Sequence, residues 1–133
     1  MYLVTAVTHE RQPLFADFWL ARRAIRELRK ADDNGLSRTL AFVVMPDHLH
    51  WLFELSDQPL PKLVGQVKAG VSAAINQECG APGVPRWQKG FHDRALRREE
   101  DLPALARYVV ANPVRAGIAQ RVGSYPHWDA IWL

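Results

Sequence analysis

Two apolar segments joined by a short turn constrain the fold of this chain more than any other feature of its sequence. Residues 39–44 (TLAFVV) and 48–55 (HLHWLFEL) are rich in residues that favour β-strands, and Met45-Pro46-Asp47 between them suits a tight connection. Both segments carry apolar residues on two faces, which is typical of strands in the middle of a sheet. The sequence therefore predicts a central hairpin over residues 39–55.

The segments around this hairpin alternate between strand and helix patterns. Residues 2–7 (YLVTAV) consist mainly of β-formers, whereas apolar residues recur at helical spacing in 14–30 and 60–78. The full prediction is strands at 2–7, 39–44, 48–55, 86–89 and 91–96, the last two forming a hairpin around Gly90, and helices at 14–30, 60–78 and 98–110, with 114–133 mostly irregular.

This order of elements predicts an α+β fold in a single domain over residues 1–133. Strands that interleave with two helices in this way suit a ferredoxin-like split βαβ sandwich, with an antiparallel sheet and helices on one face. One sheet face is then left over. We expect a functional site on that face or at its edge.

The composition fits such a domain and leaves its partner open. Hydrophobic residues make up 48% of the chain, and 17 Lys and Arg against 14 acidic residues give a formal net charge of +3. This mild excess permits a polyanionic partner without requiring one. Cys79 is the only cysteine, and no apolar run approaches the ~18 residues that span a bilayer. We expect a cytoplasmic protein with no membrane segment and no internal disulfide.

His48 and His50 are the first candidates for chemistry. On a strand, side chains two residues apart share a face with Cα atoms ~6.6 Å apart, so two imidazoles can converge on one divalent cation. Leu49, Trp51 and Phe53 alternate with them and form an apolar face for the helices. The histidines are therefore expected on the face that the helices leave uncovered. The pattern alone also fits two half-exposed histidines without a ligand.

Tyr108 and Asn112 are the second candidates. They lie four residues apart on the last predicted helix and so share a face. Pro113 is expected to end that helix, which frees the Asn112 side chain to reach outward. Such a pair can place a phenolic nucleophile beside an amide metal ligand. Taken alone, the spacing of Tyr108 and Asn112 is explained more simply by a packed tyrosine and an asparagine at a helix end.

A basic stretch with interleaved aromatic residues is the third candidate. Cations can neutralise phosphates while aromatic rings stack on bases, although a solvated hairpin edge has the same composition. The predicted nucleic-acid contacts are Arg86, Lys89, Arg94, Arg97 and Arg98, together with Lys62 and Lys68 on the second helix.

In this order, the three features resemble the REP-associated tyrosine transposases, which are relatives of single-strand insertion-sequence transposases among the HUH nucleases. The resemblance spans nearly the whole chain. The matching segments are YLVTAVTHERQPLF (2–15), FVVMPDHLHWLFEL (42–55), WQKGFHDRALRREEDL (87–102) and RYVVANPVRAGI (107–118).

The resemblance implies a role for each candidate residue. His48 and His50 match the HUH histidines, which would bind Mg²⁺ or Mn²⁺ with Asn112 as third ligand, and Tyr108 matches the catalytic tyrosine. The implied activity is cleavage and transfer of single-stranded or hairpin DNA through a 5′-phosphotyrosine, by a monomer or homodimer in the bacterial nucleoid. Asp47 departs from the asparagine of many relatives, and its role is left open.

Two other functions remain possible from the sequence. One is a module of the same fold that binds hairpin nucleic acid without cutting it. The other is an unrelated His-x-His metalloenzyme, which would need further acidic or histidine ligands. Retention of His48, His50, Tyr108 and Asn112 favours the nuclease over the binding module.

Overall fold

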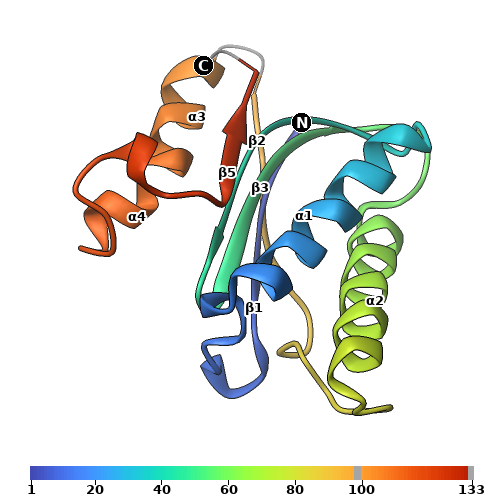
Figure 1. The fold of residues 1–133 in the computed structure, drawn as a ribbon. Coiled ribbons are helices and arrows are strands. Elements are labelled where there is room, and N and C mark those ends of the chain that lie inside the picture. Colours follow the sequence, from blue (N-terminus) through green and yellow to red (C-terminus); the bar gives the residue numbers. More distant parts are fainter. Residues whose placement is uncertain (98–99, 132–133) are drawn as a thin grey trace.

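The predicted central hairpin is confirmed, and it forms the middle of a five-stranded antiparallel sheet (Figure 1). The computed structural model describes residues 1–97 and 100–131. The strands are β1 (Tyr2–Val7), β2 (Ser37–Met45), β3 (His48–Leu55), β4 (His92–Ala95) and β5 (Trp128–Ala130), in the spatial order β4-β1-β3-β2-β5. The α-helices are α1 (Phe18–Asp33), α2 (Leu60–Cys79), α3 (Leu102–Val110) and α4 (Asn112–Arg115), and short 3₁₀ turns lie at His9–Arg11, Leu14–Ala16 and Val122–Ser124.

One face of the sheet packs against α1 and α2, as the alternation in β3 predicts. Leu49, Trp51 and Phe53 point to this side and are fully buried in the main core, where Leu28 of α1 and Val71 of α2 meet them. Because their strand neighbours point the opposite way, His48 and His50 lie on the other face.

That other face is not bare, and this corrects the prediction that the helices lie on one face only. The α+β class is confirmed, but α3 packs across β2, β3 and β5 on the side opposite α1 and α2, as Figure 1 shows. Ala106 and Val110 of α3 are buried against Leu52, and Val109 is buried against Val43. The physical reason is the two-sided apolar character of β2 and β3, which requires a cover on each face.

The predicted hairpin around Gly90 is wrong. β4 pairs with β1 along Tyr2–Thr5, and Trp87 forms an isolated bridge with Thr8. The two short segments therefore extend along the same edge of β1 in succession and do not pair with each other. β3 pairs with only one edge of β1. The other edge has backbone N–H and C=O groups without partners, and the two short segments bond to these groups and not to each other.

The boundaries of the first and last helices also differ from the prediction. Asp17 caps α1 by accepting from the backbone N–H groups of Trp19 and Leu20, so the preceding turn is separate. Asp101 caps α3 in the same way through the N–H of Ala104, which starts this helix later than predicted. The final segment, predicted to be irregular, contains β5 on the free edge of β2.

Within the described ranges 1–97 and 100–131, none of the helices combines the length and apolar character that a bilayer crossing requires.

Candidate metal and tyrosine site

The two histidines of β3 lie next to each other on the sheet face shared with α3. Their ring centroids are 4.9 Å apart and the rings are nearly perpendicular, with an interplanar angle of 81°. Both side chains are partly buried. The pair is therefore held in place yet open on one side, as a ligand-binding pair requires.

Both imidazoles are oriented through the same ring nitrogen. His48 Nδ1 donates to the Asp47 carboxylate at 2.7 Å, and His50 Nδ1 is 2.8 Å from the Thr5 hydroxyl. Metal-binding histidines commonly engage one nitrogen in this manner, which fixes the ring and leaves the other nitrogen for the metal. The two Nε2 atoms are accordingly the available ligands.

Asp47 joins the histidine pair to the turn that follows β1. Its carboxylate also pairs with Arg11 at 3.2 Å. Burial raises the pKa of Asp47, but the hydrogen bonds and charges of His48 and Arg11 outweigh it and hold that pKa below its usual value. Asp47 is thus a stable anion that accepts a hydrogen bond from His48. Its role, which the sequence leaves open, is to orient this imidazole.

His50 is neutral at physiological pH. Burial, followed by the positive charges of His48 and Arg115, lowers its pKa from 6.5 to about 4. A metal ion must bind an unprotonated imidazole, so this shift removes the competition between protons and metal near pH 7.

The remaining ligands of a metal here would have to be of another kind. Among residues 1–97 and 100–131, no group of three His, Cys, Asp or Glu side chains could hold a metal ion. Asn112 is the first residue of α4, and its Nδ2 donates to the Val109 carbonyl at 2.8 Å. This bond uses the amide N–H and leaves the amide oxygen, which is the atom that ligates hard cations. Asn112 therefore keeps one donor atom of the kind that hard cations take.

Tyr108 is exposed on α3, and Arg115 of α4 holds its ring. The phenol side chain is 60% accessible to solvent, so it is not locked in the core. The guanidinium carbon of Arg115 lies 3.7 Å from the Tyr108 ring centroid, in a stacked cation–π contact. Arg115 also contributes to the lowered pKa of His50. The same cation therefore stacks on the tyrosine of α3 and acts through its charge on His50 of β3.

Sequence reasoning missed three residues of this arrangement, Arg115, Thr5 and Arg11, and left the role of Asp47 open. Arg115 follows Tyr108 by seven residues, a helical spacing that could have indicated a shared face, but the change of helix at Ala111 obscures it. Thr5 could be found only from the pairing of β1 with β3, which places it opposite His50. Arg11 and the orienting role of Asp47 carry no distinct sequence signal.

The predicted DNA contacts fall into two groups. Some are engaged within the protein: Lys68 donates to the carbonyls of Gln88 and Gly90, Arg86 to Asn76, and Arg94 to the carboxylate of Glu100. The others, Lys62, Lys89 and Arg97, are exposed, and Arg98 lies outside the described residues.

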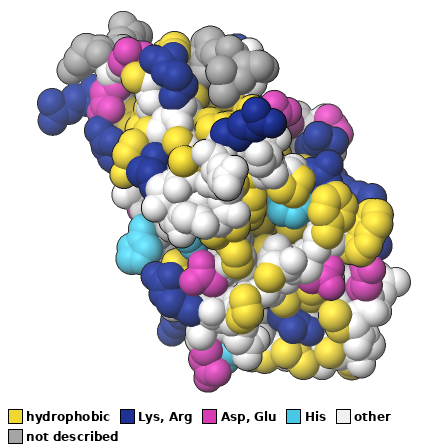
Figure 2. All heavy atoms as spheres, turned by 60° about the vertical axis from the view of Figure 1, so that its left-hand side comes forward, with side chains coloured by type: hydrophobic (Ala, Val, Ile, Leu, Met, Phe, Trp, Pro, Cys, Tyr) yellow, Lys and Arg dark blue, Asp and Glu magenta, His cyan; other side chains and the backbone are white. Residues whose placement is uncertain are grey.

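Lys89 is an exposed predicted contact that lies close to Thr5, the residue that contacts His50. It lines a pocket of about 150 Å³ together with Thr5, whose hydroxyl contacts His50, and with His92 of β4. Figure 2 shows that Lys and Arg side chains on the face bearing α3 are distributed among hydrophobic ones and do not form one block. A nucleic acid bound here would meet separate cations along its path.

Comparisons with known proteins identify the family of this chain. Residues 1–112 match the family model described as "Transposase IS200 like". A REP-associated tyrosine transposase of Escherichia coli is 26% identical over 117 residues, covering 86% of this chain and 66% of that protein. A putative REP-associated tyrosine transposase of Haemophilus influenzae is 26% identical over 99 residues, covering 67% of this chain and 56% of that protein. The matched segments thus span less than two thirds of these relatives.

Solved structures show the same fold. The structure of a REP-associated tyrosine transposase bound to a REP hairpin superposes with a TM-score of 0.72 at 22% identity, over 96% of this chain and 74% of that one. A putative transposase from Deinococcus radiodurans gives a TM-score of 0.60 at 20% identity, over 84% and 88%. The chain therefore belongs to the IS200-like transposase family, and within that family it is related to the REP-associated tyrosine transposases.

Proposed function

We propose that this protein is a metal-dependent single-stranded DNA endonuclease and strand transferase that acts on hairpin DNA through a 5′-phosphotyrosine intermediate. The observation that carries the proposal is the orientation of the histidine pair. Asp47 and Thr5 hold the two Nδ1 atoms, which leaves both Nε2 atoms free as ligands on the sheet face that also bears the Tyr108 helix.

The chemistry follows from these positions. Tyr108 would attack the scissile phosphorus through its phenolic oxygen, forming the phosphotyrosine ester as the bond to the 3′-oxygen breaks. The phenol loses its proton to solvent, and the departing 3′-oxygen gains one to become a hydroxyl. A bound Mg²⁺ or Mn²⁺ would withdraw charge from the phosphate and so favour attack by an anionic nucleophile. The reverse attack by a 3′-hydroxyl rejoins a strand without a nucleotide cofactor.

Arg115 has two functions in this proposal. Its planar guanidinium holds the phenol ring by stacking, which limits the positions that the nucleophile can occupy. Its charge would stabilise the negative charge that collects on the phosphate in the transition state. Since Arg115 influences both Tyr108 and His50 of its own chain, we propose that one chain forms the complete site.

Hairpin DNA as the substrate class is supported by the relatives. A REP-associated tyrosine transposase of the same fold is bound to a REP hairpin in its solved structure. Lys62, Lys89 and Arg97, which are exposed and form no ion pair within residues 1–97 and 100–131, are our candidates for phosphate contacts.

The proposal is tested by trapping the covalent intermediate. We expect the wild-type protein, incubated with labelled hairpin oligonucleotides and Mn²⁺, to form a protein–DNA adduct that survives denaturing electrophoresis. Tyr108→Phe should form none, whereas Tyr2→Phe, a change of the same kind on β1, should form as much as wild type. His48→Ala should bind the hairpin and fail to cut it.

An adduct with Tyr108→Phe would exclude Tyr108 as the nucleophile. Binding by the wild-type protein without cleavage of any hairpin would favour the alternative function, a module that binds hairpin nucleic acid without cutting it.

A further inference from the structure

The solvent side of α1 carries two exposed aromatic rings that the site described above does not use. Trp19 is 68% and Phe18 is 43% accessible to solvent, although large aromatic side chains usually bury most of their surface. The two rings contact each other edge to face, with centroids 5.1 Å apart. Phe18 also packs on His127 at 5.0 Å, which fixes the base of this aromatic pair.

Three arginines continue from these rings along the same side of α1. Phe18, Arg22, Arg26 and Arg29 follow one another at intervals of four, four and three residues, so they form one stripe on the helix. Arg22 lies over the Phe18 ring at 5.5 Å. We call Phe18, Trp19, Arg22, Arg26 and Arg29 the α1 stripe.

The cations of the α1 stripe differ from the other cations of the same helix. Arg23 pairs with Glu78 of α2 at 2.7 Å, and Lys30 pairs with Glu27 at 3.2 Å. In the described part of the chain, Arg26 and Arg29 form no ion pair. The cations outside the stripe thus have acidic partners, and these two keep their charge free for a ligand.

The aromatic end of the stripe lies at the end of the sheet where the histidine strand begins. The backbone N–H of Phe15 donates to the carbonyl of Pro46, in the turn that leads into His48. Arg22 reaches the carbonyl of Pro126 at 3.4 Å, and the neighbouring Tyr125 donates to Val44 near the end of β2. The aromatic end of the stripe therefore lies near the turn that leads into the histidine strand.

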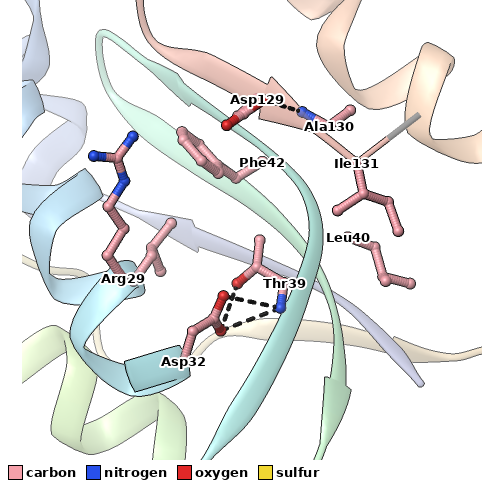
Figure 3. A pocket seen from close by; sticks show the side chains of 9 residues that line it. Arg29, Asp32, Thr39, Leu40, Phe42, Asp129, Ala130 and Ile131 are labelled. Atoms are coloured by element: carbon pink, nitrogen blue, oxygen red, sulfur yellow. Dashed lines mark hydrogen bonds between the residues drawn. The ribbon is translucent and has the colours of Figure 1, made fainter. Parts of the chain in front are cut away.

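The other end of the stripe opens into a pocket of about 240 Å³ between α1, β2 and β5 (Figure 3). Arg29 extends along its wall and away from Asp32. The Asp32 carboxylate is engaged, because it accepts from Ser37 and Thr39, and Asp129 accepts from the N–H of Ala130. These bonds reduce the repulsion that the two carboxylates would exert on an anion beside Arg29.

We propose that the α1 stripe binds the single-stranded DNA that flanks the hairpin, with bases stacked on Trp19 and Phe18 and phosphates held by Arg22, Arg26 and Arg29. Exposed aromatic rings beside guanidinium groups are the features by which proteins hold single strands without reading sequence. The inference rests on the proposed function, since the flank must be attached to a hairpin that occupies the site.

The test compares two probes in a Tyr108→Phe background, where no covalent product forms. One probe is a fluorescein-labelled DNA hairpin with a blunt stem, and the other carries a single-stranded tail of about ten thymidines on its 5′ or 3′ end. We expect one of the tails to raise affinity about tenfold, measured by fluorescence anisotropy. Trp19→Ser should abolish this gain, and Arg26→Gln should reduce it to about threefold at moderate salt.

Arg23→Gln is the matched control, because it removes an arginine from the same helix that is already paired with Glu78. It should keep the full gain. All variants should bind the blunt hairpin equally, and because Trp19 and Arg26 are exposed, the variants should melt at the wild-type temperature.

Three results would overturn the inference. If the hairpins bind equally with and without tails, the α1 stripe does not hold the flank, although the proposed function stands. If no probe binds at all, both fail. If Trp19→Ser leaves the gain intact but dissociates a dimer in light scattering, the stripe is a contact between two copies of the chain.

Discussion

At the scale of single residues, the site depends on hydrogen bonds made by atoms that would not touch a metal. His48 and His50 each use Nδ1 to contact a fixed oxygen, one from the preceding residue and one from a neighbouring strand. Without these contacts each ring could rotate. Metal binding would then have to fix the orientation of both imidazoles. Asp47 and Thr5 make that ordering part of the fold.

Asp47→Ala is therefore expected to weaken Mn²⁺ binding by about 10- to 100-fold, the usual effect of losing such an orienting partner. Asp47→Asn should retain most of the affinity, because its amide oxygen can accept the same bond from His48 Nδ1. Calorimetric titration or the loss of the free Mn²⁺ signal in electron paramagnetic resonance measures both variants. Unchanged Mn²⁺ affinity in Asp47→Ala would contradict the orienting role.

The low pKa of His50 predicts that the metal-free protein loses stability in mild acid. The unfolded chain takes up a proton at this histidine near pH 6.5, while the folded chain does so only at about 4. Between these values the unfolded state binds more protons, so the free energy of unfolding falls as the pH is lowered, by up to about 3 kcal/mol.

Urea denaturation at several pH values between 7 and 4 checks this prediction. Burial also lowers the pKa of His127, so that histidine adds to the acid sensitivity. His50→Gln isolates the part that belongs to His50, and its unfolding free energy should vary less with pH than that of the wild-type protein. An identical pH dependence in the two proteins would show that His50 titrates normally.

At the scale of elements, the change of helix between α3 and α4 brings Arg115 against Tyr108. α3 ends at Val110 and α4 begins at Asn112, with Pro113 in its first turn. Proline lacks the N–H that a continuous helix would need at this position but fits the start of a new one. Asn112, Tyr108 and Arg115 therefore lie around one bend.

Arg115→Met is expected to slow adduct formation by about 100-fold, as loss of one positioned charge donor commonly does, with little effect on hairpin binding. Arg115→Lys should recover part of the rate, since it restores the charge but not the planar stack on Tyr108. The matched control is Arg107→Met, which removes an exposed arginine next to Tyr108.

A second measurement separates this effect from a simple loss of structure. Because the charge of Arg115 helps to lower the pKa of His50, Arg115→Met should raise that pKa in an NMR titration of the histidines. A normal rate of adduct formation together with an unchanged His50 pKa would remove Arg115 from the site.

The elements also show what could be read from the sequence. The alternation in β3 was sufficient to place His48 and His50 on one face and the core residues on the other, because the strand period is two. The partner of α3 could not be predicted in this way. Its apolar side requires a cover, but nothing local distinguishes the two sheet faces.

The pairing of β4 with β1 could not be predicted from the local sequence either. Gly90 gives the signal of a hairpin turn, and it has the positive φ of 79° that such a turn would use. The pairing of β4 with β1 is instead favoured by the open edge of β1 and by Lys68 of α2, which donates to the carbonyls of Gln88 and Gly90. Both of these partners are distant in sequence.

At the scale of the whole molecule, the stacking of Arg115 on Tyr108 and the effect of its charge on His50 predict that one chain forms a complete site. Mixing Tyr108→Phe with His48→Ala should therefore restore no cleavage, because each chain lacks one half of the machinery. Recovery of about a quarter or more of the wild-type rate would instead show that the tyrosine of one chain serves the histidines of another. Cleavage of labelled hairpin DNA at equal total protein measures the outcome.

The proposed chemistry forms a bond between Tyr108 and DNA, and peptide mass spectrometry detects that bond directly. The wild-type protein would be incubated with hairpin DNA and Mn²⁺, then digested with nuclease and protease. We predict that the peptide containing Tyr108 carries the added mass of a 5′-phosphonucleotide, and that this mass is absent from His48→Ala. A nucleotide found on Tyr2 or Tyr125, or an equal yield from His48→Ala, would contradict the assignment of nucleophile and metal ligands.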